Sequence, residues 1–179
     1  MRTSSVPYRE AQSWHHCAVH AVNHLLQRRE CSVWEFEDIA DELQRRTGGI
    51  RHKAPLGLGG YSADVVLMAL KRRELEAVVL DMRKPEEALT RLRGETVVGA
   101  LVNEVKHPAW WQFWRSERHW LAVLRRVRTR PGGQGDQSEW LVVDSQDDDR
   151  RPPEPLSDEA FLAYVAAALP GCVVFLVYR

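Results

Sequence analysis

Three residues that lie far apart in the chain, Cys17, His119 and Asp144, are of the types that form a nucleophile, its base and the group that orients the base. The spacing of apolar residues predicts a helix over residues 14–29, which places Cys17 in its first turn. The free N–H groups and the positive end of the helix dipole favour a thiolate at such a position. A buried, unreactive cysteine is the common alternative, and Cys17 taken alone would favour it.

The residues around His119 and Asp144 predict an antiparallel hairpin that brings these two side chains together. Strands are expected over residues 119–127 and 140–145, with a polar turn between them. A symmetric turn at Pro131–Gly132 would set His119 directly opposite Asp144, and alternation would put both on one face of the sheet. Asp144 would then hold the imidazole and leave its other nitrogen for the cysteine. A solvated surface pair is the alternative, and it is less natural among so many apolar neighbours.

Gln12 lies five residues before Cys17, on the approach to the predicted helix. Its amide, together with the backbone N–H of Cys17, could bind the oxyanion of a tetrahedral intermediate. A glutamine in a polar N-terminal stretch carries no information by itself. Together the four residues have the chemistry of acyl transfer, which requires no metal and no cofactor, and we expect neither.

The rest of the chain predicts helices first and strands late, which is typical of an α+β fold with a mostly antiparallel sheet. Ser32 and Glu35 form a capping box that opens a second helix, and residues 47–60 are expected to be a loop. Ser62 is expected to cap a third helix, and Pro85 to begin a short fourth one. Further strands are predicted over residues 77–80, 97–102 and 172–178, with a last helix over 158–169 capped by Ser157.

Composition excludes several classes of protein. The chain has 179 residues, enough for one domain, and 25 basic residues balance 25 acidic ones, which argues against a general nucleic-acid binder. Three widely spaced cysteines without a CxxC motif form neither a disulfide framework nor a zinc finger. We therefore expect a reducing compartment, which is the cytoplasm, with the nucleus as a further alternative. No segment resembles a signal peptide or is apolar enough to span a bilayer.

Two further features have competing interpretations. His16, His20 and His24 recur along one side of the first helix at a spacing that a zinc site could use, but nothing completes a ligand set. A partly exposed polar face is therefore expected for His16 and His24. Between Trp110 and Trp114, four aromatic residues precede His119, and we expect two or three of them to cover the core. The alternative is an exposed element that binds a partner surface or contacts a membrane.

The order Gln12, Cys17, His119, Asp144 resembles that of the Josephin family of papain-like cysteine proteases. The matching segments are CAVHAVNHLLQ at the first helix, HWLAV at His119 and WLVVDS at Asp144, and His20 also matches a recurring position. The resemblance covers nearly the whole chain and is strongest to the short, Josephin-only members. It implies a papain-like α+β fold, with N-terminal helices packed on a mostly antiparallel sheet, as one catalytic domain over residues 1–179.

The resemblance also implies hydrolysis of ubiquitin linkages by a thiol protease, with ubiquitin or ubiquitin chains as the partner of a monomer. Carried over residue by residue, it assigns Cys17 as the nucleophile, His119 as the base, Asp144 as the orienting acid and Gln12 as the oxyanion donor. It also assigns Ala63 and Asp64 as contacts with ubiquitin. Two alternatives stay open at this point. One is a ubiquitin-binding module with little turnover, against which the intact catalytic quartet argues, and the other is a protease for a different ubiquitin-like modifier.

Overall fold

The structure, a computed structural model, describes residues 7–11, 16–54, 60–106, 117–129, 136–146, 153–168 and 171–179. Its described helices are α1 (Cys17–Leu26), α2 (Val33–Arg46), α3 (Ala63–Lys71), α4 (Pro85–Leu92) and α5 (Asp158–Ala168). The strands β1 (Glu76–Val79), β2 (Val97–Lys106), β3 (Glu117–Thr129), β4 (Asp136–Val143) and β5 (Val173–Tyr178) form one antiparallel sheet in the order β1-β5-β2-β3-β4. The predicted α+β fold is confirmed.

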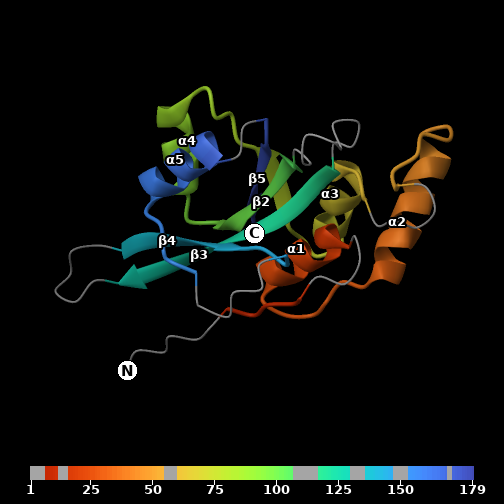
Figure 1. The fold of residues 1–179 in the computed structure, drawn as a ribbon, viewed down its shortest axis with the longest axis horizontal. Helices are drawn as coiled ribbons and strands as arrows, with labels where there is room; N and C mark the ends of the chain where they lie inside the picture. Colours follow the sequence, from red (N-terminus) through yellow and green to blue (C-terminus); the bar gives the residue numbers. More distant parts are fainter. Residues whose placement is uncertain are drawn as a thin grey trace.

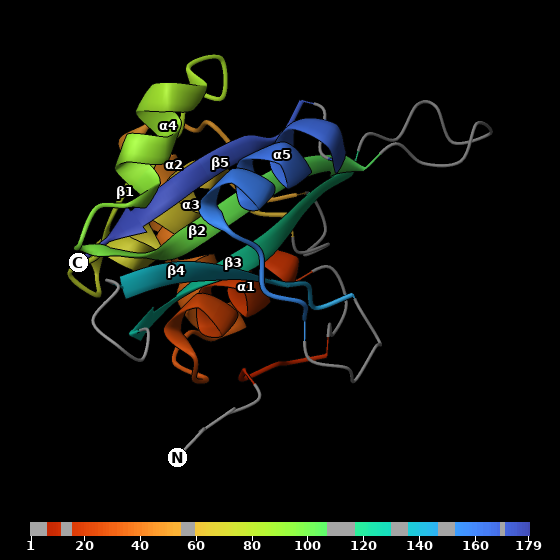
Figure 2. The same cartoon turned by 90° about the vertical axis from the view of Figure 1, so that its left-hand side faces the viewer.

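Helices cover both faces of this sheet (Figures 1 and 2). One core lies between the sheet and α1, α2 and α3, and a second lies on the opposite face with α4 and α5. Alternation along β3 divides its side chains between the two cores, so that Trp120 and Ala122 face the first core while Leu121 and Val123 face the second. Within the described residues, no helix is both long enough and apolar enough to cross a membrane.

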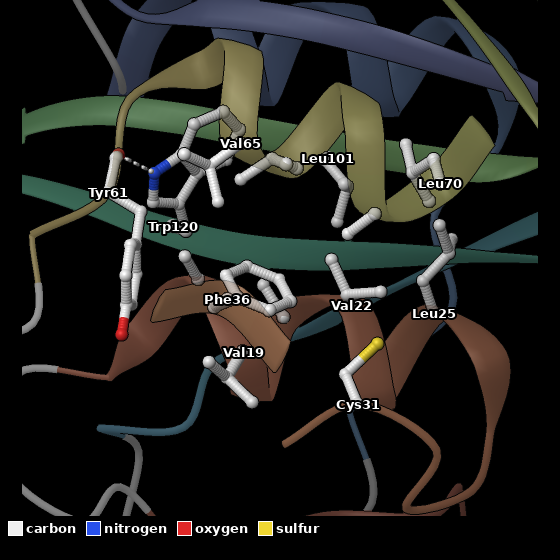
Figure 3. Close-up of a cluster of buried hydrophobic side chains, with 14 of the residues drawn as sticks. Val19, Val22, Leu25, Cys31, Phe36, Tyr61, Val65, Leu70, Leu101 and Trp120 are labelled. Atoms are coloured by element: carbon white, nitrogen blue, oxygen red, sulfur yellow. Dashed lines mark hydrogen bonds between the residues drawn. The ribbon is translucent and has the colours of Figure 1, made fainter. Parts of the chain in front are cut away.

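Figure 3 shows the first core, where Val22 of α1, Phe36 of α2 and Leu70 of α3 meet Trp120 of the sheet. The indole N–H of Trp120 donates a hydrogen bond of 3.4 Å to the backbone carbonyl of Tyr61. This bond satisfies the polar atom of a residue that is otherwise buried among apolar side chains. Trp120 directly follows His119, so its packing fixes the backbone that carries the predicted base.

Helices α2, α3 and α5 start directly after the predicted capping serines, although the Ser62 side chain makes no capping hydrogen bond to α3. The Ser32 hydroxyl accepts a hydrogen bond of 3.2 Å from the Glu35 N–H, and the Ser157 hydroxyl accepts one of 3.1 Å from the Ala160 N–H. Helix α4 begins at Pro85, as expected. Helix α1 is shorter than predicted because it ends before Gln27, whose φ of 57° is left-handed and whose N–H returns to helix carbonyls.

The register of the β3–β4 hairpin differs from the prediction. Val123 pairs with Val142, not with Trp140, so the observed pairing is shifted by two residues. Strand β4 already begins at Asp136, within the expected turn, because polar cross-strand contacts such as Arg125 with Ser138 (3.0 Å) continue the ladder there. An even shift leaves every side chain on its predicted face, so the error in register does not separate the site residues by face.

Candidate active site

Helix α1 presents Cys17 at its first helical position, after His16. The side chain is buried, with 6 % of the residue exposed, and α1 packs mainly against β3. The His16 side chain makes no capping hydrogen bond to α1. The positive N-terminal end of the helix dipole lies at the first turn, which contains Cys17. The sulfur therefore lies at the positive end of the helix dipole.

His119 and Asp144 form a direct hydrogen bond in which Nε2 of the imidazole lies 2.6 Å from Oδ1 of the carboxylate. Asp144 follows the last residue of β4 rather than lying opposite His119 in the ladder. Its Oδ1 also accepts a hydrogen bond of 2.9 Å from the Gln146 N–H, which closes a local turn and fixes the carboxylate. The structure thus brings together the predicted base and the predicted orienting acid, by a turn rather than by strand pairing.

The charge of the His119 ring is set by opposing effects. Burial by itself would lower its pKa, because His119 is only 2 % exposed, but the hydrogen bond and charge of Asp144 and the nearby Cys17 raise the pKa to about 9. Since Nε2 is bound to Asp144, Nδ1 is the ring nitrogen available to the sulfur. A protonated imidazole beside Cys17 stabilises a thiolate and carries a proton that a leaving group could accept.

A second carboxylate, Glu104, lies beside this pair, and the sequence analysis missed it. Glu104 is the direct neighbour of His119 across the β2–β3 ladder. The polar atoms of Glu104, His119 and Asp144 lie within 4.8 Å of one another. On α5, burial raises the pKa of Tyr164, and the charges of Glu104 and Asp144 raise it further. The signal in the sequence was a glutamate just beyond a strand that was predicted to end at Val102.

The polar side of α1 is buried at His20 and His24, which corrects the expectation for His24, whereas His16 is partly exposed, as expected. His24 is fully buried and His20 is 8 % exposed. A carboxylate that the sequence analysis did not connect with them, Glu10, lies 2.6 Å from Nδ1 of His20. The signal was a set of polar residues at helical spacing, His20, Asn23 and His24, inside a helix that is otherwise apolar.

The remaining predicted site residues are distributed as follows. Gln12 lies outside the described residues, as do the aromatic residues between Trp110 and Trp114. Ala63 and Asp64 form the first turn of α3, which packs on α1 and α2. Ala63 is partly buried against the first core, whereas the Asp64 carboxylate is exposed and lies 3.3 Å from Nδ1 of His52.

The sequence of the chain is similar to those of several known proteins. The model of the Josephin family matches residues 12–178. Josephin-2 from Homo sapiens is 33% identical over 176 residues, which cover 95% of this chain and 85% of that protein, and Josephin-2 from Mus musculus is 32% identical over the same length. A Josephin-like protein from Drosophila melanogaster is 30% identical over 122 residues, 66% of this chain and 54% of that protein.

Proposed function

The chain belongs to the Josephin family, whose members are in general thiol-protease deubiquitinases, and we propose that it hydrolyses peptide and isopeptide bonds at the C-terminus of ubiquitin. The observation that supports this most directly is the buried His119–Asp144 pair of 2.6 Å beside Cys17, with the pKa of His119 raised to about 9. This is the state in which an imidazole can both stabilise a thiolate and protonate an amine.

In the proposed reaction, the Cys17 thiolate attacks the carbonyl carbon of the C-terminal glycine of ubiquitin. The C–N bond then breaks, the leaving lysine amine takes the proton of His119, and a thioester remains on the sulfur. His119, now neutral, removes a proton from water, the resulting hydroxide attacks the thioester, and the sulfur leaves as a thiolate while the imidazole is again protonated. Asp144 stays ionised and holds the ring in both steps.

We assign Gln12 to the oxyanion and Ala63 with Asp64 to the ubiquitin surface. An amide N–H from Gln12 would bind the negative oxygen of the tetrahedral intermediate, together with the Cys17 N–H. The start of α3 offers a small side chain next to an exposed carboxylate, which suits contact with a basic surface that carries a slender, glycine-rich tail. These roles rest on membership of the family and on position in the sequence.

A ubiquitin derivative that carries an electrophile at its C-terminus tests the proposal. The wild type is expected to form a covalent adduct and to cleave ubiquitin conjugates, and Cys17→Ala is expected to lose both activities. Cys172→Ser is the matched control, because burial raises the pKa of Cys172 and so leaves it a poor nucleophile.

The outcomes separate the alternatives. Cleavage by the Cys17→Ala protein would contradict the proposal. Binding of ubiquitin by the wild type without an adduct would instead indicate a recognition module. A panel of electrophilic modifiers tests the remaining alternative, since preferential reaction with another ubiquitin-like protein would change the substrate but not the chemistry.

A further inference from the structure

Glu104 of β2 and His119 of β3 form a cross-strand pair at the candidate active site. Cross-strand partners point to the same face of a sheet, with their Cβ atoms about 5 Å apart. Alternation from Val102, which belongs to the second core, places this pair on the face of the sheet that α5 covers. A carboxylate oxygen of Glu104, a ring nitrogen of His119 and a carboxylate oxygen of Asp144 all lie within 4.8 Å of one another. One imidazole therefore faces two carboxylates.

The cluster of these three side chains is arranged around a proton. Nε2 of His119 and Oδ1 of Asp144 are 2.6 Å apart, which is the distance of a short, charge-assisted hydrogen bond. A Zn²⁺ ion bound to both atoms would hold them about 3 Å or more apart. The feature of the cluster that the proposed mechanism leaves unused is therefore the second negative charge, that of Glu104.

The charge of Glu104 acts on other groups around the imidazole. On α5, burial raises the pKa of Tyr164, and the charges of Glu104 and Asp144 raise it further. Burial also raises the pKa of Cys172, the residue before β5, and the charge of Glu104 adds to this effect although a backbone hydrogen bond opposes it. A hydroxyl and a thiol respond to a nearby negative charge by staying neutral, whereas an imidazole responds by holding a proton.

Two further groups next to the ring, Cys17 and Arg118, act differently. Burial by itself would lower the pKa of His119, and Cys17 of α1 joins Asp144 in raising it. Arg118 precedes His119 on β3 and points to the opposite face, where its guanidinium donates a hydrogen bond of 2.8 Å to Oδ1 of Asn103. This arginine therefore does not stand between the second carboxylate and the imidazole.

We propose that Glu104 is a positioning residue, a second carboxylate that acts through His119 by keeping the proton on its ring for the leaving amine. The inference rests on the proposed function and adds one residue to it. Asp144 binds Nε2 by a direct hydrogen bond, whereas Glu104 acts across the β2–β3 ladder through its charge. With two carboxylates the site keeps its acid at a more alkaline pH than it would with one.

Glu104→Gln removes the charge and keeps the size of the side chain. Unit charges 4.8 Å apart change a pKa by about 0.6 in water and by more at a lower dielectric constant, and Glu104 is partly buried. We therefore expect the alkaline fall of kcat/KM for a fluorogenic amide of the ubiquitin C-terminus, the ubiquitin amide, to begin about 0.5–1 pH unit lower. Near pH 7 the ring stays protonated in both proteins, so kcat/KM should remain within about twofold of the wild type.

The pKa of the ring can also be followed without any substrate. In ¹⁵N-edited NMR spectra of the histidine side chains, the His119 signals are identified by their loss in His119→Gln, and their titration reports the pKa of this ring. We expect the midpoint to fall in Glu104→Gln by the same amount as the alkaline limb of activity. Glu104→Asp keeps a charge on a shorter side chain and should restore part of the difference.

Glu139→Gln is the matched control. Glu139 also lies in the sheet, on β4, but its ladder partner is Arg126 and its carboxylate pairs with Arg128 at 2.9 Å. Arg126 is about 23 Å from His119 along β3, beyond the range of a screened surface charge. The alkaline limb and the ring titration should therefore both match the wild type. If Glu104→Gln does not fold, Glu104→Thr takes its place, because threonine suits a strand and carries no charge.

The outcomes distinguish the role of Glu104 from the proposed function. A wild type that neither cleaves the ubiquitin amide nor reacts with the electrophilic ubiquitin would overturn both. With an active wild type, an unmoved alkaline limb and an unmoved ring titration in the folded, uncharged variant would overturn the role of Glu104 alone. So would a lower kcat/KM at every pH with no change in the shape of the profile, since Glu104 would then support the structure rather than the proton.

Discussion

At the scale of residues, the site depends on how the charge of one imidazole is balanced. His119 is buried deeply enough that its neutral form would be favoured, and Asp144 and Cys17 reverse this preference. Asp144 is itself held by the Gln146 N–H, so the carboxylate is fixed before any substrate arrives. The direction of the His119 pKa shift therefore depends on its contacts with Asp144 and Cys17.

Removing the charge of Asp144 should shift the alkaline limit of activity. Below a pH of about 9, His119 holds the proton that the leaving amine needs, and above it this proton is lost and the rate falls. In Asp144→Asn the raising effect of the charge is absent, so the alkaline limb should move toward about 6.5, the ordinary pKa of histidine. The measurement is kcat/KM for the ubiquitin amide against pH, with the partly exposed Asp81→Asn, whose carboxylate pairs with Arg83, as control. An alkaline limb that does not move would refute this account of the His119 charge.

At the scale of elements, local signals predicted most boundaries, and the long-range geometry was harder to predict. The capping serines and Pro85 identify helix starts because the relevant hydrogen bonds involve neighbours in the sequence. The hairpin register was wrong because a turn sequence does not reveal how far polar cross-strand contacts extend the ladder. Glu104 was missed for the same reason, since it reaches the site only through the pairing of β2 with β3. The contact of Glu10 with His20 was missed because a histidine on a helix does not reveal which segment packs against it.

Gly99 of β2 lies where Leu25 of α1 packs tightly against the sheet. A Cβ atom at this position would lie 2.5 Å from the Val123 carbonyl oxygen and 2.7 Å from Cδ1 of Leu25 on α1. Gly99→Ala is therefore expected to lower the free energy of unfolding by about 1–3 kcal/mol, as overpacked cores do. Urea denaturation measures this change. Val79→Ala, on the edge strand and 54% exposed, should change stability by no more than about 0.5 kcal/mol. An equal effect of the two substitutions would show that the approach of α1 is not tight.

At the scale of the whole molecule, we expect the buried residues His24 and His119 to lower the free energy of unfolding on opposite sides of neutral pH. Burial lowers the pKa of His24, so between pH 7 and 5 the unfolded chain takes up a proton that the folded chain does not, and stability falls on acidification. The lowered pKa of Glu10 has the same sign at more acidic pH. His119 acts in the opposite sense, because its contribution is complete below about 6.5 and is lost as the pH rises through about 9.

We therefore expect the free energy of unfolding to be greatest near pH 6.5–7, because the His24 contribution is lost below this range and the His119 contribution is lost above it. On the acidic side it should fall by at most about 1.4 kcal/mol per pH unit for each group. Urea denaturation at a series of pH values measures the profile. His24→Asn, which has no titrating group at this position, should flatten the slope between pH 7 and 5. If the variant keeps the slope of the wild type, His24 does not cause it.

The place of β5 in the sheet has a consequence for how the protein is made. This strand follows all the others in the sequence, yet it lies between β1 and β2, where Glu76 pairs with Tyr178. On the ribosome, both of its neighbours must therefore wait with open hydrogen-bonding edges until Val173–Tyr178 has emerged. Chaperones that cover such edges would be needed until β5 emerges, and a premature stop before Val173 would remove a strand from inside the sheet and leave β1 without its described partner.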